Sequence, residues 1–198
     1  NLSGIETLSL IPGTAGAAPV QNIGAYGAEA STTIAWVEAI TIATGKLVRF
    51  NNDACDFSYR HSRFNTTDKG KYAITKVGFT LKNSSKLKNG HAIALPFYKD
   101  VALYLAERNI TKPRPSAIRD AVIAIRQAKL PDPARMANNG SFFKNPIISA
   151  EQFEALAKEH PSIPHWQTDD GRFKLAGGWL IEQAGFKGYK DKQTGMAV

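Results

Sequence analysis

The alternation of apolar and polar residues predicts strands in the first half of the chain. β-Branched and aromatic residues flank Thr44-Gly45, a turn signal, and predict a β-hairpin with strands near 34–43 and 46–50. A largely alternating apolar face predicts another strand over 72–82. The segment 55–64 mixes polar and aromatic residues too irregularly for a period to be assigned.

Helical spacing takes over further along the chain. A helix of roughly two turns is expected within 95–110, with Asp100 as its cap. The clearest helix is predicted over 116–130, because its apolar residues fall on one face. Ser116 is its expected cap, and Pro131 and Pro133 are expected to stop it.

Two shorter helices are predicted in the last third. Ser149 and Gln152 have the spacing of a capping box, so a helix should begin there. Its expected buried stripe is Phe153, Leu156 and Ala157. Another helix is predicted around Trp179–Ala184, closed by Gly185. Strands, hairpin and helices without regular βαβ alternation indicate an α+β fold, with no internal repeat.

Composition adds limits on size and organisation. With 198 residues and 43% hydrophobic content, the chain can form one large domain or two small ones. A boundary near the Pro-Asp-Pro at 131–133 would separate a larger first part from a smaller second part. The chain begins at Asn1 rather than Met, and a new apolar segment begins near Val198. We therefore expect a fragment that lacks residues at both ends.

Charge and cysteine usage narrow the function classes. The net charge of +8 would suit nucleic acid, an acidic surface or anionic small molecules. The basic residues are spread out and carry no nucleic-acid-binding motif, so phosphorylated metabolites are favoured over DNA or RNA. The single cysteine, Cys55, fits a reducing compartment and is expected to be a buried spectator, because His61 lacks an orienting acid. Histidine spacing predicts no metal site, and no run of about 18 apolar residues predicts a membrane span.

The first thirty residues are dominated by small side chains, in "IPGTAGAAPVQNIGAYG" (11–27). The segment matches neither GxGxxG nor the GxxxxGK[ST] phosphate loop. The alternative is a low-complexity segment with no functional role, but specific polar residues interrupt the run of small side chains. We expect a tight, backbone-lined pocket for a flat or phosphorylated ligand.

Ser141 lies in an unusual segment, "LPDPARMANNGSFFKNP" (130–146). A hydrolase triad is disfavoured, because Ser141 has no G-x-S-x-G elbow. The bland alternative is a turn serine that bonds local backbone groups. Against this stand Lys129, Lys144 and Asn145, with Arg60 from the first part of the chain. Such a set could hold a carboxylate or phosphate while the hydroxyl gives up a proton.

Four segments together carry a resemblance. "IPGTAGAAPVQNIGAYG", "FSYRHSRF", "KLPDPARMANNGSFFKNP" and "KLAGGWLIEQAGFKG", in this order, are similar to the UDP-N-acetylenolpyruvoylglucosamine reductase family, also called UDP-N-acetylmuramate dehydrogenase. Any one segment would be modest support, whereas four in order cover most of the chain. The resemblance implies an FAD enzyme that uses NADPH in peptidoglycan precursor synthesis, cytoplasmic and monomeric, with no nucleic acid or membrane partner.

The resemblance also implies a domain plan. Residues 1–130 would be the second subdomain of a vanillyl-alcohol-oxidase/PCMH-like FAD-binding domain, with an extra segment that contains Tyr98. Residues 131–198 would be a small α+β substrate-binding domain. Matched to the family, the expected FAD-binding residues are Ile11, Pro12, Gly13, Thr14, Gly16, Ala17, Val20, Gln21, Asn22, Gly24 and Tyr26.

The same match implies roles at the reacting centre. Ser141 would donate the proton that follows hydride transfer from the flavin to the enolpyruvyl group. Arg60 would stabilise the charge that develops on the substrate carboxylate. The expected substrate-binding residues are Tyr98, Lys129, Asn145 and Trp166. The direction of Lys144 is left open.

The sequence also departs from the family pattern. His61 stands where the family often has an acid, Asn139 where it often has alanine, and "LAGGW" replaces "LAAGW". A late catalytic glutamate would lie beyond Val198, so the isolated fragment is expected to be nearly inactive. Two alternatives remain: another flavin oxidoreductase of the same fold, and a basic nucleic-acid-binding module.

Overall fold

The computed structural model describes residues 2–132, 134–137 and 141–197. Pro133 and the Asn138–Gly140 part of the serine segment lie outside them. The chain divides into two compact units, Asn1–Ala137 and Asn138–Val198. Each unit is described by itself. The predicted division into 1–130 and 131–198 stays a prediction.

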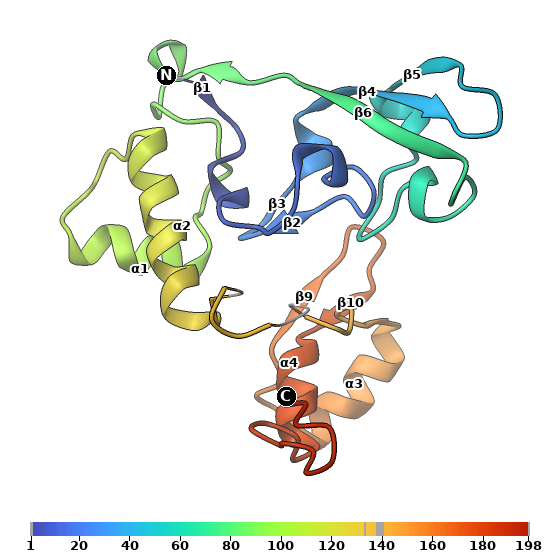
Figure 1. The fold of residues 1–198 in the computed structure, drawn as a ribbon. Coiled ribbons are helices and arrows are strands. Elements are labelled where there is room, and N and C mark those ends of the chain that lie inside the picture. The colour runs from blue at the N-terminus through green and yellow to red at the C-terminus, as the bar shows by residue number, and fades with distance from the viewer. Residues whose placement is uncertain (1, 133, 138–140, 198) are drawn as a thin grey trace. The chain divides into compact units, whose positions relative to one another are not determined.

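Unit 1 is built on a three-stranded antiparallel sheet of order β5-β4-β6 (Figure 1). Its strands are β4 (Ile34–Thr41), β5 (Leu47–Asn51) and β6 (Tyr72–Phe79). The predicted hairpin and the predicted strand over 72–82 are therefore confirmed. Turn Thr44-Gly45 closes the hairpin, with Gly45 at φ +67°.

Short elements surround this sheet. Two-stranded ladders join β1 to β7 and β2 to β3, both antiparallel. The bounds of these strands are β1 Leu2–Ser3, β2 Gly24–Ala25, β3 Ala28–Glu29 and β7 Lys82–Asn83. Single 3₁₀ turns are η1 Glu6–Leu8, η2 Ala15–Ala17, η3 Ala30–Thr32, η4 Asn52–Cys55, η5 Arg63–Asn65 and η6 Ser84–Lys86. The irregular segment 55–64 thus lies between two such turns.

Two helices complete unit 1, α1 (Lys99–Glu107) and α2 (Pro115–Lys129). Both predicted caps are wrong. Asp100 lies inside the first turn of α1, whose N-cap is Tyr98. The N-cap of α2 is Arg114, because Pro115 occupies the first helical position, where its fixed φ suits a helix start. As predicted, α2 stops before Pro131.

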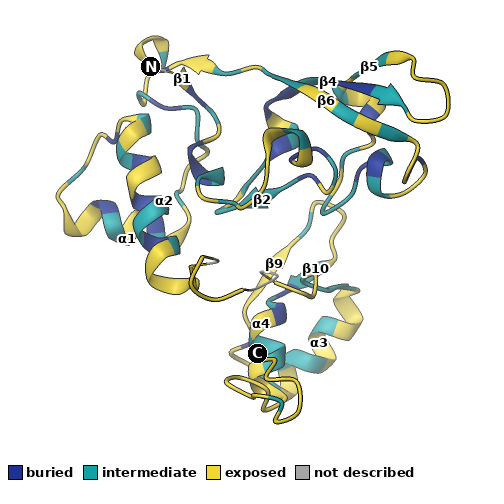
Figure 2. Cartoon of the chain, viewed as in Figure 1, coloured by how far each residue is buried: buried dark blue, intermediate teal, exposed yellow. Residues whose placement is uncertain are grey.

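Unit 1 has two buried clusters, drawn in dark blue in Figure 2. One joins α1 and α2, through Val101, Leu105, Ile118, Ala121, Val122 and Ile125. The other lies under the sheet, through Ala30, Ile34, Val37, Cys55 and Phe64. Helix α2 also packs against η1. The segment 2–30 is therefore held between helices and sheet.

Unit 2 combines a three-stranded sheet, of order β8-β10-β9, with two helices. The elements are β8 Ile147–Ile148, α3 Ala150–Glu159, β9 His165–Gln167, β10 Phe173–Leu175 and α4 Gly177–Gln183. The capping box that opens α3 is confirmed, with both reciprocal bonds formed. Helix α4 begins two residues before the predicted start, and Gly185 follows its end at φ +80°.

The predicted buried stripe of α3 is only half-buried in unit 2. Phe153 does pack inward, since its ring stacks on Phe173 at 4.1 Å between centroids. A unit of this size encloses little volume, so a helix face can be covered without being sealed from water.

Candidate active site

A large open cavity of 1510 Å³ lies within unit 1, above the 300–1,000 Å³ of most ligand pockets. The segment with small residues forms one wall. Six of the residues expected to bind FAD line the cavity: Ile11, Pro12, Gly13, Thr14, Ala17 and Gln21. Small side chains let a ligand approach the backbone closely, so this wall fits a flat ligand.

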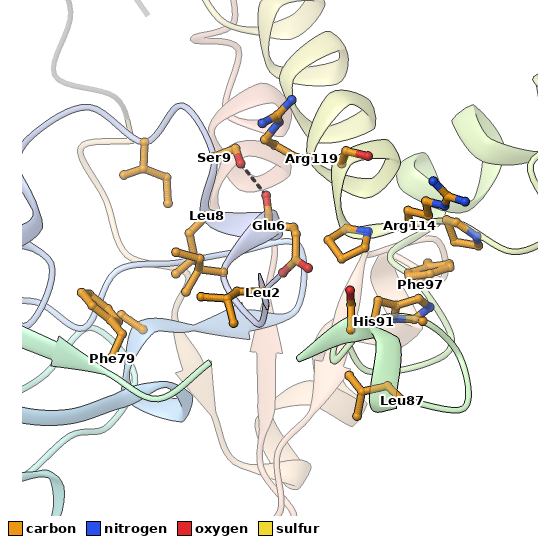
Figure 3. Close-up of a pocket in the computed structure, with 18 of the residues that line it drawn as sticks. Leu2, Glu6, Leu8, Ser9, Phe79, Leu87, His91, Phe97, Arg114 and Arg119 are labelled. Carbon is orange, nitrogen blue, oxygen red and sulfur yellow. Dashed lines mark hydrogen bonds between the residues drawn. The ribbon is translucent and has the colours of Figure 1, made fainter. Parts of the chain in front are cut away.

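The other walls of the cavity differ in character (Figure 3). Leu2, Leu8 and Phe79 give an apolar side, whereas Arg114 and His91 stand on the opposite side. Further basic lining residues are Lys88, Lys112 and Arg119. An apolar side facing a cationic side suits a ligand with an aromatic ring and anionic groups.

Gly13 is required by the backbone of the cavity wall. Its φ is +114°, a conformation that L-residues with a side chain rarely adopt. A Cβ at Gly13 would meet only the Cβ of Ala17, at 3.9 Å. Backbone conformation, rather than space, therefore explains the glycine.

The remaining residues expected to bind FAD lie away from the cavity lining. Gly16 faces the sheet, where an added Cβ would be 3.7 Å from the Ile74 carbonyl oxygen of β6. The Val20 carbonyl oxygen accepts a hydrogen bond from Ser62 Oγ at 2.6 Å. Their expected contact with FAD stays a prediction.

Asn22 has a buried side chain with 0% exposure and a left-handed backbone at φ +46°. Its Nδ2 donates to Glu29 Oε2 at 2.7 Å and to the Ser58 carbonyl oxygen at 3.1 Å. Its Oδ1 accepts from the Ser31 N–H at 2.9 Å. The side chain therefore ties three loops together.

Arg60 is half-buried and lies against the β2–β3 ladder. Its Nη2 donates to the Gly24 carbonyl oxygen at 2.9 Å. A Cβ at Gly24 would lie 2.8 Å from the Ala28 carbonyl oxygen and 3.1 Å from Arg60 Nη1. Gly24, an expected FAD-binding residue, thus leaves room for the arginine expected to act on the substrate.

Two predictions about neighbouring groups have different outcomes. The prediction that His61 has no acid beside it is wrong, because Asp56 Oδ2 lies 3.0 Å from His61 Nε2.

Cys55 is fully buried, as predicted. Burial raises the pKa of the Cys55 thiol to about 11, and the nearby Arg63 only partly opposes this. The thiol is therefore protonated at neutral pH.

A second polar group gathers where α1, α2 and the β2–β3 turn meet. The Tyr26 and Tyr98 rings touch edge to face, 5.5 Å between centroids. Lys129 Nζ lies 2.7 Å from Asp100 Oδ2 and joins the end of α2 to the start of α1. The structure thus brings together three predicted residues: Tyr26, Tyr98 and Lys129.

Burial and neighbouring charges shift the pKa values of Tyr26 and Lys129. Burial raises the pKa of the Tyr26 hydroxyl, although the cationic Arg126 and Lys129 oppose the shift. The hydrogen bond that Lys129 donates to the Asp100 carboxylate raises the pKa of Lys129. Lys129 is thus a cation with an exposed head that can take a second anionic partner.

In unit 2, Ser141 and Lys144 are exposed at the start of the described part. Asn145 follows, and its Oδ1 accepts from the Gly177 N–H, the first of α4, at 2.9 Å. This bond satisfies one of the unpaired donors at a helix start. Asn145 thus fixes the serine segment to α4.

Trp166 of β9 is 40% exposed, as befits a ring available for stacking. Lys174 is its cross-strand partner on β10, with Nζ 5.7 Å from the ring centroid. The pair presents an aromatic face beside a cation on one side of the sheet. Such a surface suits a nucleotide.

Sequence reasoning missed the anions that accompany the predicted cations. The sequence predicts Asp100 as a helix cap and indicates no role for Asp56. Asp100 lies 29 residues from Lys129, so no local pattern links them. Asp56 lies only 5 residues from His61, but the irregular segment between them has no period from which their contact could be predicted. Within the described ranges, no cluster of His, Cys, Asp and Glu could hold a metal ion, and no helix is suited to crossing a membrane.

Two segments of the chain match models of known protein families. Residues 132–197 match the C-terminal domain of UDP-N-acetylenolpyruvoylglucosamine reductase. Residues 1–51 match an FAD binding domain. This second match includes the cavity wall formed by 11–21.

Curated relatives match over nearly the whole chain. UDP-N-acetylenolpyruvoylglucosamine reductase from Chromobacterium violaceum is 44% identical over 194 residues, 98% of this chain and 55% of the relative. The protein of the same name from Paraburkholderia phymatum is 47% identical over 189 residues, 94% of this chain and 53% of the relative. The chain thus spans about half the length of the curated relatives it matches.

A solved structure supports the fold. The crystal structure of UDP-N-acetylenolpyruvylglucosamine reductase from Thermus caldophilus superposes with a TM-score of 0.50 at 16% identity. The match covers 100% of this chain and 51% of that one. With the two domain matches, it confirms the predicted α+β fold class.

Proposed function

We propose, on the premise that the chain belongs to the UDP-N-acetylenolpyruvoylglucosamine reductase family, that it forms part of an FAD-dependent reductase of that nucleotide sugar. NADPH would be the reductant and the product a UDP-N-acetylmuramate. The protein would act as a cytoplasmic monomer. Residues 1–130 would contribute to the FAD-binding domain and residues 131–198 to the substrate domain.

The observation that carries the proposal is the lining of the 1510 Å³ cavity by the segment 11–21. Its backbone-exposing wall, together with the cationic side around Arg114, fits a dinucleotide with a flat ring and phosphates. The wall formed by 11–21 would hold FAD, which when bound would supply hydride transfer from NADPH to the enolpyruvyl double bond. The positive φ of Gly13 would give the wall the backbone shape that faces the cofactor.

Arg60 would act on the substrate carboxylate. Its guanidinium is held by the Gly24 carbonyl oxygen at 2.9 Å, so it would meet the substrate in a fixed orientation. Hydride addition to the double bond places negative charge on the carbon next to the carboxylate. A preorganised cation there lowers the energy of that anion.

Ser141 would give its hydroxyl proton to the same carbon and so complete the lactyl ether. A serine hydroxyl is a weak acid, but the intermediate is a strong base. Lys129 and Asn145 would bind the substrate, with Tyr98 closing over the UDP part and Trp166 stacking against the nucleotide. The aromatic contact between Tyr98 and Tyr26 supports a common binding face in unit 1.

Ser141→Ala in the full-length protein tests this assignment. Flavin reduction by NADPH should remain at the native rate, because it requires no proton from Ser141. Reoxidation of the reduced flavin by the enolpyruvyl sugar nucleotide should slow by about 10²–10⁴-fold. Ser162→Ala, at another exposed serine of unit 2, is the matched control. Equal slowing of both half-reactions would assign Ser141 a structural role instead.

A further inference from the structure

The turn that carries Arg60 is strained. Ser58 and His61 exchange backbone hydrogen bonds of 3.1 and 3.0 Å, so Tyr59 and Arg60 occupy the two central positions of a tight turn. Arg60 has φ +54°, where a glycine or asparagine is usual. A non-glycine residue held in this region carries backbone strain and persists only where its surroundings enforce it.

The groups that enforce this turn can be identified. Asn22 Nδ2 donates to the Ser58 carbonyl oxygen at 3.1 Å, at the start of the turn. Asn65 Nδ2 donates to the Arg60 carbonyl oxygen at 3.2 Å. Arg60 Nη2 reaches Gly24, as described above.

The end of the turn is held by a contact between two polar side chains. His61 Nε2 lies 3.0 Å from Asp56 Oδ2, and the side chains are 33% and 68% exposed. Asp56 itself has φ +52°, at the end of η4. The pair therefore spans the loop 56–61 from one end to the other, across the base of the Arg60 turn.

We propose that Asp56 and His61 are positioning residues that hold Arg60 in its left-handed turn for action on the substrate. This inference rests on the proposed function, in which Arg60 meets the substrate carboxylate. Neither residue needs to touch the substrate. A side-chain contact this exposed adds little to global stability, so its effect would be local to the turn.

Half-reaction kinetics of the full-length holoenzyme test this inference. Asp56→Ala and His61→Ala should each slow flavin reoxidation by the enolpyruvyl sugar nucleotide by roughly 10- to 100-fold, as expected for a displaced catalytic group. Flavin reduction by NADPH should not change. Because the two residues act as a pair, the double variant should be no slower than either single variant.

Exchanging the two residues of the pair is the most discriminating variant. Asp56→His combined with His61→Asp should recover most of the lost rate, since aspartate and histidine both tolerate left-handed φ. Glu107→Ala, which breaks the exposed pair with Arg108 at 3.5 Å, is the matched control and should change nothing. Failure of the swap to recover rate, or equal slowing of both half-reactions, would overturn the inference.

A second measurement is independent of turnover. The Arg60 Nε–Hε signal in a ¹H–¹⁵N spectrum, assigned by its loss in Arg60→Lys, should shift and broaden in Asp56→Ala and His61→Ala. An unchanged signal would overturn the inference even if the enzyme is active. A native enzyme that cannot reduce the sugar nucleotide would refute the proposed function, while the spectrum still decides whether the pair positions Arg60.

Discussion

Replacing Asn22 with alanine should be among the most destabilising single changes in unit 1. The substitution removes two donors and one acceptor from a site with 0% exposure. The bond to the Glu29 carboxylate is worth about 1.5–3 kcal/mol, as a hydrogen bond to a charged group. Ser31 N–H would be left without its acceptor, at a cost of about 1–3 kcal/mol.

Two smaller terms complete the estimate for Asn22→Ala. The Ser58 carbonyl oxygen keeps its bond from the His61 N–H, so its loss is limited to about 0.5–1 kcal/mol. Alanine at φ +46° adds about 1 kcal/mol of backbone strain. Because such terms are not additive, the expected loss is about 4 kcal/mol in the free energy of unfolding.

Urea unfolding followed by circular dichroism measures this loss, as a midpoint shift at constant slope. Asn22→Gly separates the two causes, since it removes the side-chain bonds but relieves the strain, and should recover about 1 kcal/mol. Gln21→Ala, at the exposed neighbouring position, should change stability by less than about 0.5 kcal/mol. A loss below about 1 kcal/mol in both Asn22 variants would refute the reasoning.

Two further substitutions and one labelling experiment have defined outcomes. Gly24→Ala should lower the free energy of unfolding by about 1–3 kcal/mol and slow flavin reoxidation, because the added Cβ would meet Ala28 and Arg60. Gly178→Ala is the stability control, because a Cβ there would have nothing within 4 Å. Asp100→Asn should lower the KM for the UDP-sugar by about two- to fivefold with kcat unchanged, since Lys129 loses a competing anion; an increased KM would contradict this. Native Cys55 should react with a thiol reagent far more slowly than free cysteine at pH 8, because only the thiolate attacks. Its reaction should become faster as the pH rises towards about 11. Rapid labelling at pH 8 would contradict the burial of Cys55.

Elements with strong local signals were predictable from the sequence. The hairpin around Thr44-Gly45 and the helix opened by Ser149 are specified by residues within a few positions of one another. The caps of α1 and α2 were not predictable in this way. Asp100 has the right chemistry for a cap, but a bond to Lys129, 29 residues away, occupies its carboxylate.

The candidate site shows the same contrast. The small residues of 11–21 identified a cavity wall, because backbone exposure is a property of the segment itself. The supports of Arg60 come instead from Asn22, Gly24 and Asn65, which approach it only in the folded chain. Neither the periodicity nor the composition of the sequence predicts which distant residues come into contact.

The amide of Asn145 determines what kind of atom unit 2 can recognise at that position. Its oxygen is occupied by the first N–H of α4, so the nitrogen is the end directed elsewhere. An NH₂ group offers only hydrogens, and its complement is an oxygen with lone pairs, as in a phosphoryl or carbonyl group. In the proposed substrate site, α4 would therefore favour a ligand that presents an acceptor oxygen to Asn145.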